Sequence, residues 1–148
     1  MFVLDTNVVS ELRKVRFGKA DAHVAKWADS VDAASLYVSA ITILELEIGI
    51  LQMETRDPTQ GAMLRAWMDN HVVPEFRERV LPVDTAVARR CARLHVPDRR
   101  SERDALIAAT ALVHGMTIVT RNLPDFEPSG VAVLNPWNIS PATQPPKA

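Results

Sequence analysis

The hydrophobic pattern alternates between short apolar runs and longer segments in which apolar side chains recur every three or four residues. Short runs bounded by polar turns predict strands, and a spacing of three or four predicts amphipathic helices. The predicted strands cover residues 2–4, 35–39, 80–84, 117–120 and 131–134. The predicted helices cover residues 8–12, 21–30, 42–53, 61–71, 85–94 and 101–113. This alternation predicts an α/β fold, with a central five-stranded, mostly parallel sheet and helices on both faces.

Local signals refine the expected ends of these elements. Thr6 or Asn7 is expected to cap the first helix, because side chains of these types accept hydrogen bonds from backbone N–H groups. Thr42 and Glu45 have the spacing of a capping box, which would place Glu45 in the first helical turn. Pro82 cannot donate a hydrogen bond to a neighbouring strand, so the strand that contains it is expected at an edge of the sheet.

The composition is that of an ordinary globular protein, with 47% hydrophobic residues and 17 basic against 18 acidic side chains in 148 residues. This length predicts one domain at residues 1–138, and the proline-containing residues 139–148 are expected to be a disordered tail. Cys91 is the single cysteine, which excludes an intrachain disulfide and fits a reducing, cytoplasmic location. No apolar stretch reaches the roughly 18 residues of a membrane span. The net charge of −1 argues against a strongly basic nucleic-acid-binding surface overall, but it allows a local basic patch.

Four acidic side chains are predicted to meet at one edge of the sheet. Asp5 directly follows the first strand, Glu45 lies early in the helix after the second strand, and Asp125 follows the fourth. Asp104 opens the helix that leads into the fourth strand, and it joins the others if that helix starts beside the end of the first strand. Ligands of parallel sheets bind at the carboxyl ends of the strands, which is where these acids would gather.

Each acid also has a purely structural interpretation. Asp5 can be a turn residue at the end of a strand, and Asp125 can be an ordinary loop acid. Glu45 and Asp104 can serve only to cap their helices. The coincidence of all four at one edge of the sheet is what favours a functional site.

A cluster of four carboxylates predicts a bound cation. Packed together, the carboxylates repel one another, so some stay protonated unless a cation neutralises them. Oxygen ligands without clustered Cys or His suit a hard cation such as Mg²⁺ or Mn²⁺. Such an ion lowers the pKa of a bound water and stabilises charge on a phosphoryl oxygen. The pattern therefore predicts metal-dependent hydrolysis of a phosphodiester bond without a covalent protein nucleophile.

Four motifs resemble those of the PIN-domain ribonucleases, in particular the FitB-like members of the VapC toxin family. They are residues 1–11, which contain Asp5-Thr6-Asn7; residues 38–49, similar to S-x-I-T-x-x-E-L-x-x-G; residues 104–111; and residues 119–126, similar to T-R-N-x-x-D-F. The ending at residues 133–137 is also similar to that of FitB-type members. The resemblance covers about residues 1–138, and the presence of four motifs in order makes it specific.

The resemblance implies a PIN fold and a Mg²⁺- or Mn²⁺-dependent endoribonuclease that is the toxin of a type II toxin–antitoxin pair. It implies that the catalytic and metal-binding residues are Asp5, Glu45, Asp104 and Asp125. It also implies that four polar residues orient these acids, namely Thr6, Asn7, Thr120 and Asn122. Ordinary turn and cap chemistry is the alternative for these four residues. A homodimer, and inhibition by a small antitoxin whose tail fills the site, are further implications. The chain departs from the family in the short, highly charged approach to Asp104 at residues 97–103.

An acidic site repels RNA, so basic side chains must surround it. The leading candidates for contacts with RNA phosphates are Arg13 and Lys14 after the first helix, and Arg121 beside the fourth motif. Further basic residues near the motifs are Arg16, Arg99, Arg100 and Arg103. A solvated surface is the alternative for all of them, and Arg89, Arg90 and Arg93 have the pattern of an exposed helix face. Trp27 and Trp67 occur at helical spacing among apolar residues, which favours a core or interface role over stacking on bases.

Three other functions remain open at this point. A PIN nuclease of RNA processing would share the chemistry, and a neighbouring reading frame for a small basic DNA-binding protein would favour the toxin instead. A catalytically silent PIN-like module that binds RNA or protein is disfavoured by the presence of all four acids. A haloacid-dehalogenase-type phosphotransfer protein requires a second aspartate two residues after the first, where this chain has Asn7.

Overall fold

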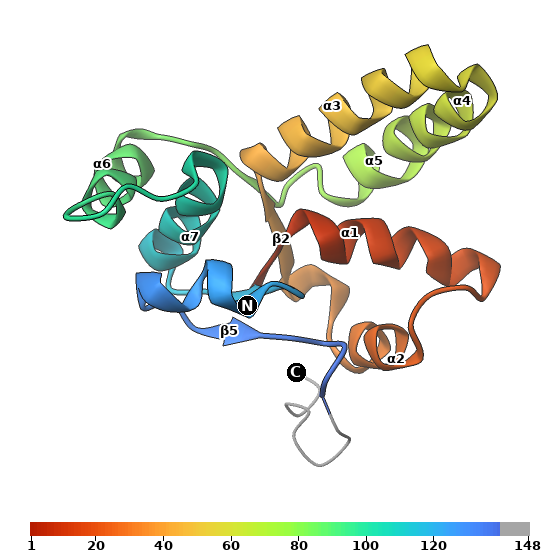
Figure 1. Cartoon of the computed structure of the whole chain (residues 1–148). Coiled ribbons are helices and arrows are strands. Elements are labelled where there is room, and N and C mark those ends of the chain that lie inside the picture. Colours follow the sequence, from red (N-terminus) through yellow and green to blue (C-terminus); the bar gives the residue numbers. More distant parts are fainter. Residues whose placement is uncertain (140–148) are drawn as a thin grey trace.

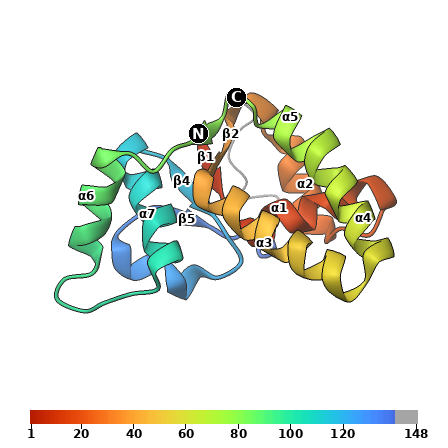
Figure 2. The same cartoon turned by 90° about the horizontal axis from the view of Figure 1, so that it is seen from above.

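The computed structural model describes residues 1–139 and contains a five-stranded parallel sheet with helices on both faces (Figures 1 and 2). Its strands are β1 (Phe2–Leu4), β2 (Leu36–Ser39), β3 (Val80–Leu81), β4 (Thr117–Val119) and β5 (Val133–Leu134). Its α-helices are α1 (Thr6–Leu12), α2 (Ala22–Ser30), α3 (Ala40–Arg56), α4 (Pro58–Trp67), α5 (Val73–Glu75), α6 (Thr85–Leu94) and α7 (Glu102–His114). Shorter 3₁₀ turns cover Arg13–Phe17, Ala33–Ser35, Leu123–Asp125 and Glu127–Ser129, and a π-helical turn covers Met68–Val72. The predicted α/β fold is confirmed.

The strand order is β3-β2-β1-β4-β5, and every neighbouring pair is parallel. The chain passes from β1 to β2 and β3 on one side and then returns to β4 and β5 on the other. The order therefore reverses between β1 and β4, which is where parallel sheets open a crevice at their carboxyl ends. The edge position predicted for the strand beside Pro82 is confirmed, because β3 is an outer strand.

Alternate residues of the central strands supply two separate cores. Leu4 faces a core with Val8, Trp27 and Val38, under the helices on one side of the sheet. The neighbouring Val3 faces the other core, whose members include Ile107 and Phe126. Figure 2 shows the corresponding layers, with α6 and α7 on one side and α1 to α5 on the other. Both faces of β1 are thus buried, as a central parallel strand requires.

The starts of α1 and α3 differ from the predictions. Asp5 caps α1 by accepting from the backbone N–H of Thr6, so the helix begins before the expected residue 8 and neither Thr6 nor Asn7 is its cap. Ser39 caps α3 by accepting from the N–H of Ile41 at 3.0 Å. The proposed capping box of Thr42 and Glu45 is therefore wrong. Glu45 lies in the second turn of α3 and is free to contact other elements.

Helices α6 and α7 form an antiparallel pair beside the sheet. Leu94, at the end of α6, lines the same cavity as Asp104 near the start of α7. At the opposite end of the pair, Ala86 of α6 lines a hollow with Val113 of α7. Gly115 ends α7 in the left-handed conformation with φ of 66°, which a residue with a side chain rarely adopts.

Ile139, the last described residue, packs against the core that contains Trp27. Most of the predicted tail, residues 140–148, lies outside the described residues. Within residues 1–139, the structure contains no helix with the length and apolar character that a membrane crossing requires.

Candidate active site

Asp5 lies at the carboxyl end of β1 and is only 6% exposed. Its backbone N–H donates to the carbonyl of Val119 at 2.9 Å, which ties the end of β1 to the end of β4. Its carboxylate accepts three hydrogen bonds, from the Thr6 N–H at 2.8 Å, the Thr120 hydroxyl at 2.8 Å and the Asn7 side-chain amide at 3.2 Å. The carboxylate is thus fixed in orientation at the point where the strand order reverses.

Burial raises the pKa of Asp5 above its ordinary value. The hydrogen bonds from Thr120 and from the Thr6 N–H act in the opposite direction, because they favour the ionised form. The negative charges of Glu45 and Asp125 add to the rise. The environment of Asp5 therefore combines donors that hold a carboxylate with neighbouring charges that oppose its ionisation.

Thr120, directly after β4, connects Asp5 to the fourth motif. Its hydroxyl donates to Asp5 Oδ2 and accepts from the backbone N–H of Asn122 at 3.0 Å and from the Asn7 amide at 3.4 Å. Asn7 Oδ1 in turn accepts from the backbone N–H of Arg121 at 3.3 Å. The side chains of Asn7 and Thr120 thus contact the Asp5 carboxylate directly, and Asn122 contributes its backbone N–H to Thr120.

Glu45 extends from the second turn of α3 toward α1. Its Oε1 accepts from the Thr6 hydroxyl at 2.7 Å, and its Oε2 lies 3.5 Å from Nη1 of Arg103 on α7. The buried Thr42 lies one turn earlier on α3, with its hydroxyl 3.2 Å from that of Thr6. Thr42 was expected only as a cap. Its spacing of three residues from Glu45 is the signal that it shares a helix face with this acid.

Asp104, in the first turn of α7, has a pKa raised to about 6. Burial is the largest cause, and the negative charges of Asp5, Asp125 and Glu45 raise it further. A hydrogen bond from Ser101 has a smaller, opposite effect. The three other acids of the predicted set therefore act on Asp104, although the four come from well-separated parts of the sequence.

The electrostatics fit a cation, whereas the spacing of the acids does not make a complete cage. In residues 1–139, no three Asp, Glu, His or Cys side chains are close enough together to hold an ion without help. Mg²⁺ is usually held by one or two carboxylates and keeps several of its waters, so it does not need such a cage. The buried Asp5 and Asp104, whose pKa is raised by the neighbouring acids, therefore fit the donor set of a hydrated divalent ion.

Three of the four acids line two cavities. One of about 280 Å³ is lined by Glu45 and Thr6 and continues to Arg13 and Trp67. The other, of about 200 Å³, is lined by Asp104 and Asp125 together with Arg100 and Ser101. Glu45 shares the first cavity with Arg13, and Asp104 and Asp125 share the second with Arg100. Basic side chains thus lie beside these acids, as binding of a polyanion requires.

The three predicted RNA-contact residues differ in their surroundings. Arg13 lies over the ring of Trp67 at 6.0 Å and lines the Glu45 cavity. Arg121 is exposed and lies over the ring of Trp137 at 5.1 Å. Lys14 is 3.2 Å from Glu11 and lines none of the described cavities. Trp27 is fully buried, as its helical spacing predicted.

Comparison with known proteins agrees with this geometry. A sequence model of the PIN domain matches residues 2–124. The VapC ribonuclease Y4jK of Sinorhizobium fredii is 37% identical over 142 residues, covering 93% of this chain and 98% of that protein. Toxin FitB of Neisseria gonorrhoeae is 34% identical over 144 residues, covering 93% of this chain and 99% of that protein.

Among solved structures, FitAB bound to a DNA fragment superposes with a TM-score of 0.84 at 33% identity, covering 95% of this chain and 98% of the matched one. The match thus extends over the entire sheet and the residues around it, not only over the four motifs. The chain belongs to the PIN-domain family, in the group that includes the VapC ribonucleases and toxin FitB.

Proposed function

We propose that this chain is a divalent-metal-dependent endoribonuclease and the toxin of a toxin–antitoxin pair. The observation that carries the proposal is the position of the acids at the carboxyl end of the sheet, where Asp5 is buried at the end of β1 and where Asp5, Asp125 and Glu45 are close enough to Asp104 to raise its pKa. Groups that oppose one another's ionisation in this way favour a bound cation. Membership in the group of VapC ribonucleases supports RNA as the substrate.

The proposed division of labour follows from the contacts. Asp5 and Asp104 would hold Mg²⁺ or Mn²⁺, with Glu45 and Asp125 as the further acids of the site. When bound, the ion would activate a water and stabilise charge on the phosphoryl group. Thr120 and Asn7 orient Asp5 through its Oδ2, and Thr6 orients Glu45 through its Oε1.

The basic side chains have a separate role in this proposal. Arg13 and Arg121 each lie against a tryptophan at the margin of the site, where they bind phosphates of the RNA without reading its sequence. Arg103 partly offsets the negative charge beside Glu45. These contacts position the backbone, and they leave the choice of cleavage sequence to other features of the RNA.

A partner protein is part of the proposal. The FitAB structure includes DNA, which supports a small DNA-binding antitoxin as the partner of this chain. Phe17 and Met63 are exposed and line a hollow of about 240 Å³ with Trp67, which offers an apolar surface for such a partner. A homodimer stays a prediction, to be checked by light scattering of the purified chain.

The proposal is tested by cleavage of single-stranded RNA in Mg²⁺ or Mn²⁺, with EDTA as the metal-free reference. We expect Asp5→Asn and Glu45→Gln to lower the cleavage rate at least about 100-fold, in line with the loss of groups at a metal site. The matched control is Glu47→Gln, two residues along α3, because Glu47 pairs with Arg65 at 2.7 Å and faces away from the acids. Equal cleavage by wild type and Asp5→Asn would reject the assignment.

The toxin role has its own experiment. Expression of the wild-type chain is expected to arrest growth, and co-expression of the neighbouring reading frame is expected to restore it. Glu45→Gln is expected to be harmless in the same assay. Growth that is unaffected by an active, cleaving protein would instead favour a PIN nuclease of RNA processing.

A further inference from the structure

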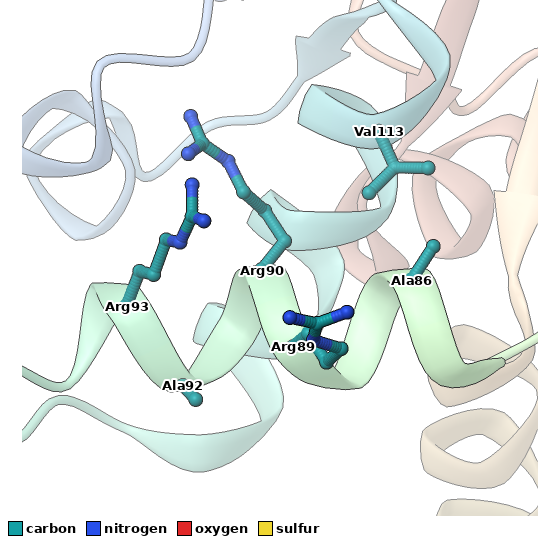
Figure 3. Close-up of a pocket in the computed structure, with 6 residues that line it drawn as sticks. All are labelled: Ala86, Arg89, Arg90, Ala92, Arg93 and Val113. Atoms are coloured by element: carbon teal, nitrogen blue, oxygen red, sulfur yellow. The ribbon is translucent and has the colours of Figure 1, made fainter.

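Three arginines of α6 line a hollow of about 530 Å³ (Figure 3). Helix α6 lies on the side of the molecule away from α1 to α5 (Figure 2). The basic lining of the hollow consists of Arg89, Arg90 and Arg93. The rest of the lining is apolar and consists of Ala86, Ala92 and Val113. Figure 3 shows Arg90 and Arg93 extending from α6 on the same side, with Arg89 across the face of the helix. The hollow is therefore basic, with a contribution from the last turn of α7.

The three positive charges lack acidic partners in the described part of the chain. None of them forms an ion pair with a carboxylate of residues 1–139. Asp84, at the start of the same helix, uses its carboxylate to cap α6 by accepting from the N–H of Val87 at 3.0 Å. Like charges three and four residues apart on a helix repel one another. Their concentration here without compensation favours an anion as the occupant.

The location connects this hollow to the acids. Arg93 directly precedes Leu94, which lines the cavity that contains Asp104 and Asp125. On α7, Val113 and Asp104 are separated by about 14 Å along the helix axis, at about 1.5 Å per residue. At 3.6 residues per turn these two residues lie on opposite sides of α7, so a strand that occupies the hollow and reaches the acids has to pass around the α6–α7 pair over more than this axial distance.

The lining indicates which part of a nucleic acid would bind. It contains no aromatic ring on which a base could stack, whereas single-strand binding sites that hold bases use such rings. Guanidinium groups are well suited to phosphate, because their N–H donors match its oxygens in pairs. The chemistry therefore favours the sugar-phosphate backbone over the bases.

We infer that Arg89, Arg90 and Arg93 form a phosphate-binding subsite that holds the RNA backbone outside the catalytic centre. The inference rests on the proposed ribonuclease function and extends it to a second contact region. The subsite contributes affinity without sequence preference, because phosphate contacts carry no base information.

The test measures binding of a mixed-sequence, single-stranded RNA oligonucleotide to the full chain in EDTA at several salt concentrations. Each phosphate contact contributes about 0.7 to the slope of log affinity against log salt for single strands. The variant R89Q/R90Q/R93Q is therefore expected to bind more weakly at low salt, with a slope shallower by about 2. The charge-preserving R89K/R90K/R93K is expected to retain most of the slope.

The matched control removes the same charge elsewhere, by K26Q/R56Q/R77Q at three exposed positions outside the hollow. An equal loss in this control, or an unchanged slope in R89Q/R90Q/R93Q, would overturn the inference. The inference would also be overturned if R89Q/R90Q/R93Q lost binding of poly-glutamate but bound RNA normally, because the hollow would then be a site for an acidic protein. If the triple variant does not fold, Arg89→Gln alone is expected to reduce the slope by about 0.7.

These outcomes are separate from those of the proposed function. Failure of the wild-type chain to cleave RNA with a divalent ion would reject the ribonuclease assignment. The binding slopes in EDTA do not depend on cleavage, so they decide the role of the α6 arginines by themselves.

Discussion

Arg103 on α7 reaches Glu45 on α3, with its Nη1 3.5 Å from Oε2. Within residues 1–139, this is the ion pair that involves a member of the acidic set. The Arg103 side chain is 51% exposed and that of Glu45 is 25% exposed, so the pair is well screened by water. Arg103 thus brings a positive charge to the place where the proposal puts a metal ion.

The first prediction follows from this competition. Removing the charge in Arg103→Gln should strengthen Mg²⁺ binding about 1.4- to fivefold, which corresponds to the roughly 0.2–1 kcal/mol of an exposed ion pair. Calorimetric titration with Mg²⁺ measures the change. Arg99→Gln, an exposed arginine of the preceding loop, is the matched control and should leave Mg²⁺ affinity unchanged. Weaker Mg²⁺ binding in Arg103→Gln would mean that Arg103 supports the site rather than competes with the ion.

The raised pKa of Asp104 predicts a pH dependence of stability. In the folded chain this carboxyl has a pKa of about 6, against an ordinary value of 3.8. The folded state therefore binds the proton more tightly than the unfolded state does. Proton binding by Asp104 therefore makes its full contribution to stability below about pH 4, and this contribution is lost as the pH rises through 6. Without metal, the free energy of unfolding should therefore contain a component that falls over this window.

Asp104→Asn isolates that component, because the amide cannot ionise. At pH 7.5 in EDTA, we expect the variant to be more stable than wild type by about 1 kcal/mol, a value reduced from the full shift because the carboxyl is partly solvated. Urea unfolding at pH 5 and pH 7.5 measures it, with the exposed Asp29→Asn as the control. Added Mg²⁺ should stabilise wild type more than the variant. Lower stability of Asp104→Asn at pH 7.5 would instead favour a capping role for Asp104.

Asn7 offers a complementary test, in which an acid is added instead of removed. Its side-chain amide donates to Asp5 Oδ2 and to the Thr120 hydroxyl. Asn7→Asp replaces that donor with a carboxylate that faces Asp5, so we expect a loss of about 1–3 kcal/mol of stability at pH 7.5 without metal. The loss should shrink at pH 5, where one carboxyl of the pair can be protonated. The exposed Asn138→Asp provides the same charge change away from the site, and equal effects of both variants would contradict the prediction.

The sequence was sufficient to predict the sheet, because strands depend on local signals, whereas the metal-binding role of the acids stays a prediction. Each strand is a short apolar run, and Asp5 follows its strand directly in the sequence. The first residue of α3 was harder to predict, because Ser39 and Thr42 can both act as an N-cap. Ser39 was assigned wholly to the strand, although as its last residue it also caps the helix. The helix gains its first residues from this choice, and Glu45 moves into the second turn.

Contacts between distant elements could not be predicted from periodicity. The pair of Arg103 and Glu45 depends on how α7 approaches α3, which no spacing along the chain encodes. The hollow beside Arg89 and Arg93 also depends on tertiary packing. The helix pattern correctly predicted that these two side chains are exposed. What the pattern could not indicate is that Val113 of another helix closes one side of the hollow. Tertiary packing thus decides which charges share a site.

The last prediction concerns the hydroxyl that fixes Asp5. Thr120 is fully buried, and it donates to Asp5 Oδ2 at 2.8 Å. Thr120→Val keeps the shape but removes this donor, so the pKa of Asp5 should rise further and its orientation should loosen. Loss of a partner that orients a ligand typically lowers metal affinity by about 10- to 100-fold, and we expect a change in this range for Mg²⁺.

Thr110→Val separates this effect from a general loss of stability. Thr110 is equally buried on α7, and its hydroxyl donates to the carbonyl of Leu106 at 2.7 Å, away from the acids. Both variants should change the free energy of unfolding by about 1 kcal/mol, but only Thr120→Val should weaken Mg²⁺ binding in calorimetric titration. If both variants bind Mg²⁺ like wild type, Asp5 does not depend on Thr120 for its role. If both weaken binding equally, the effect comes from stability and the hydrogen bond to Asp5 has no special part in holding the ion.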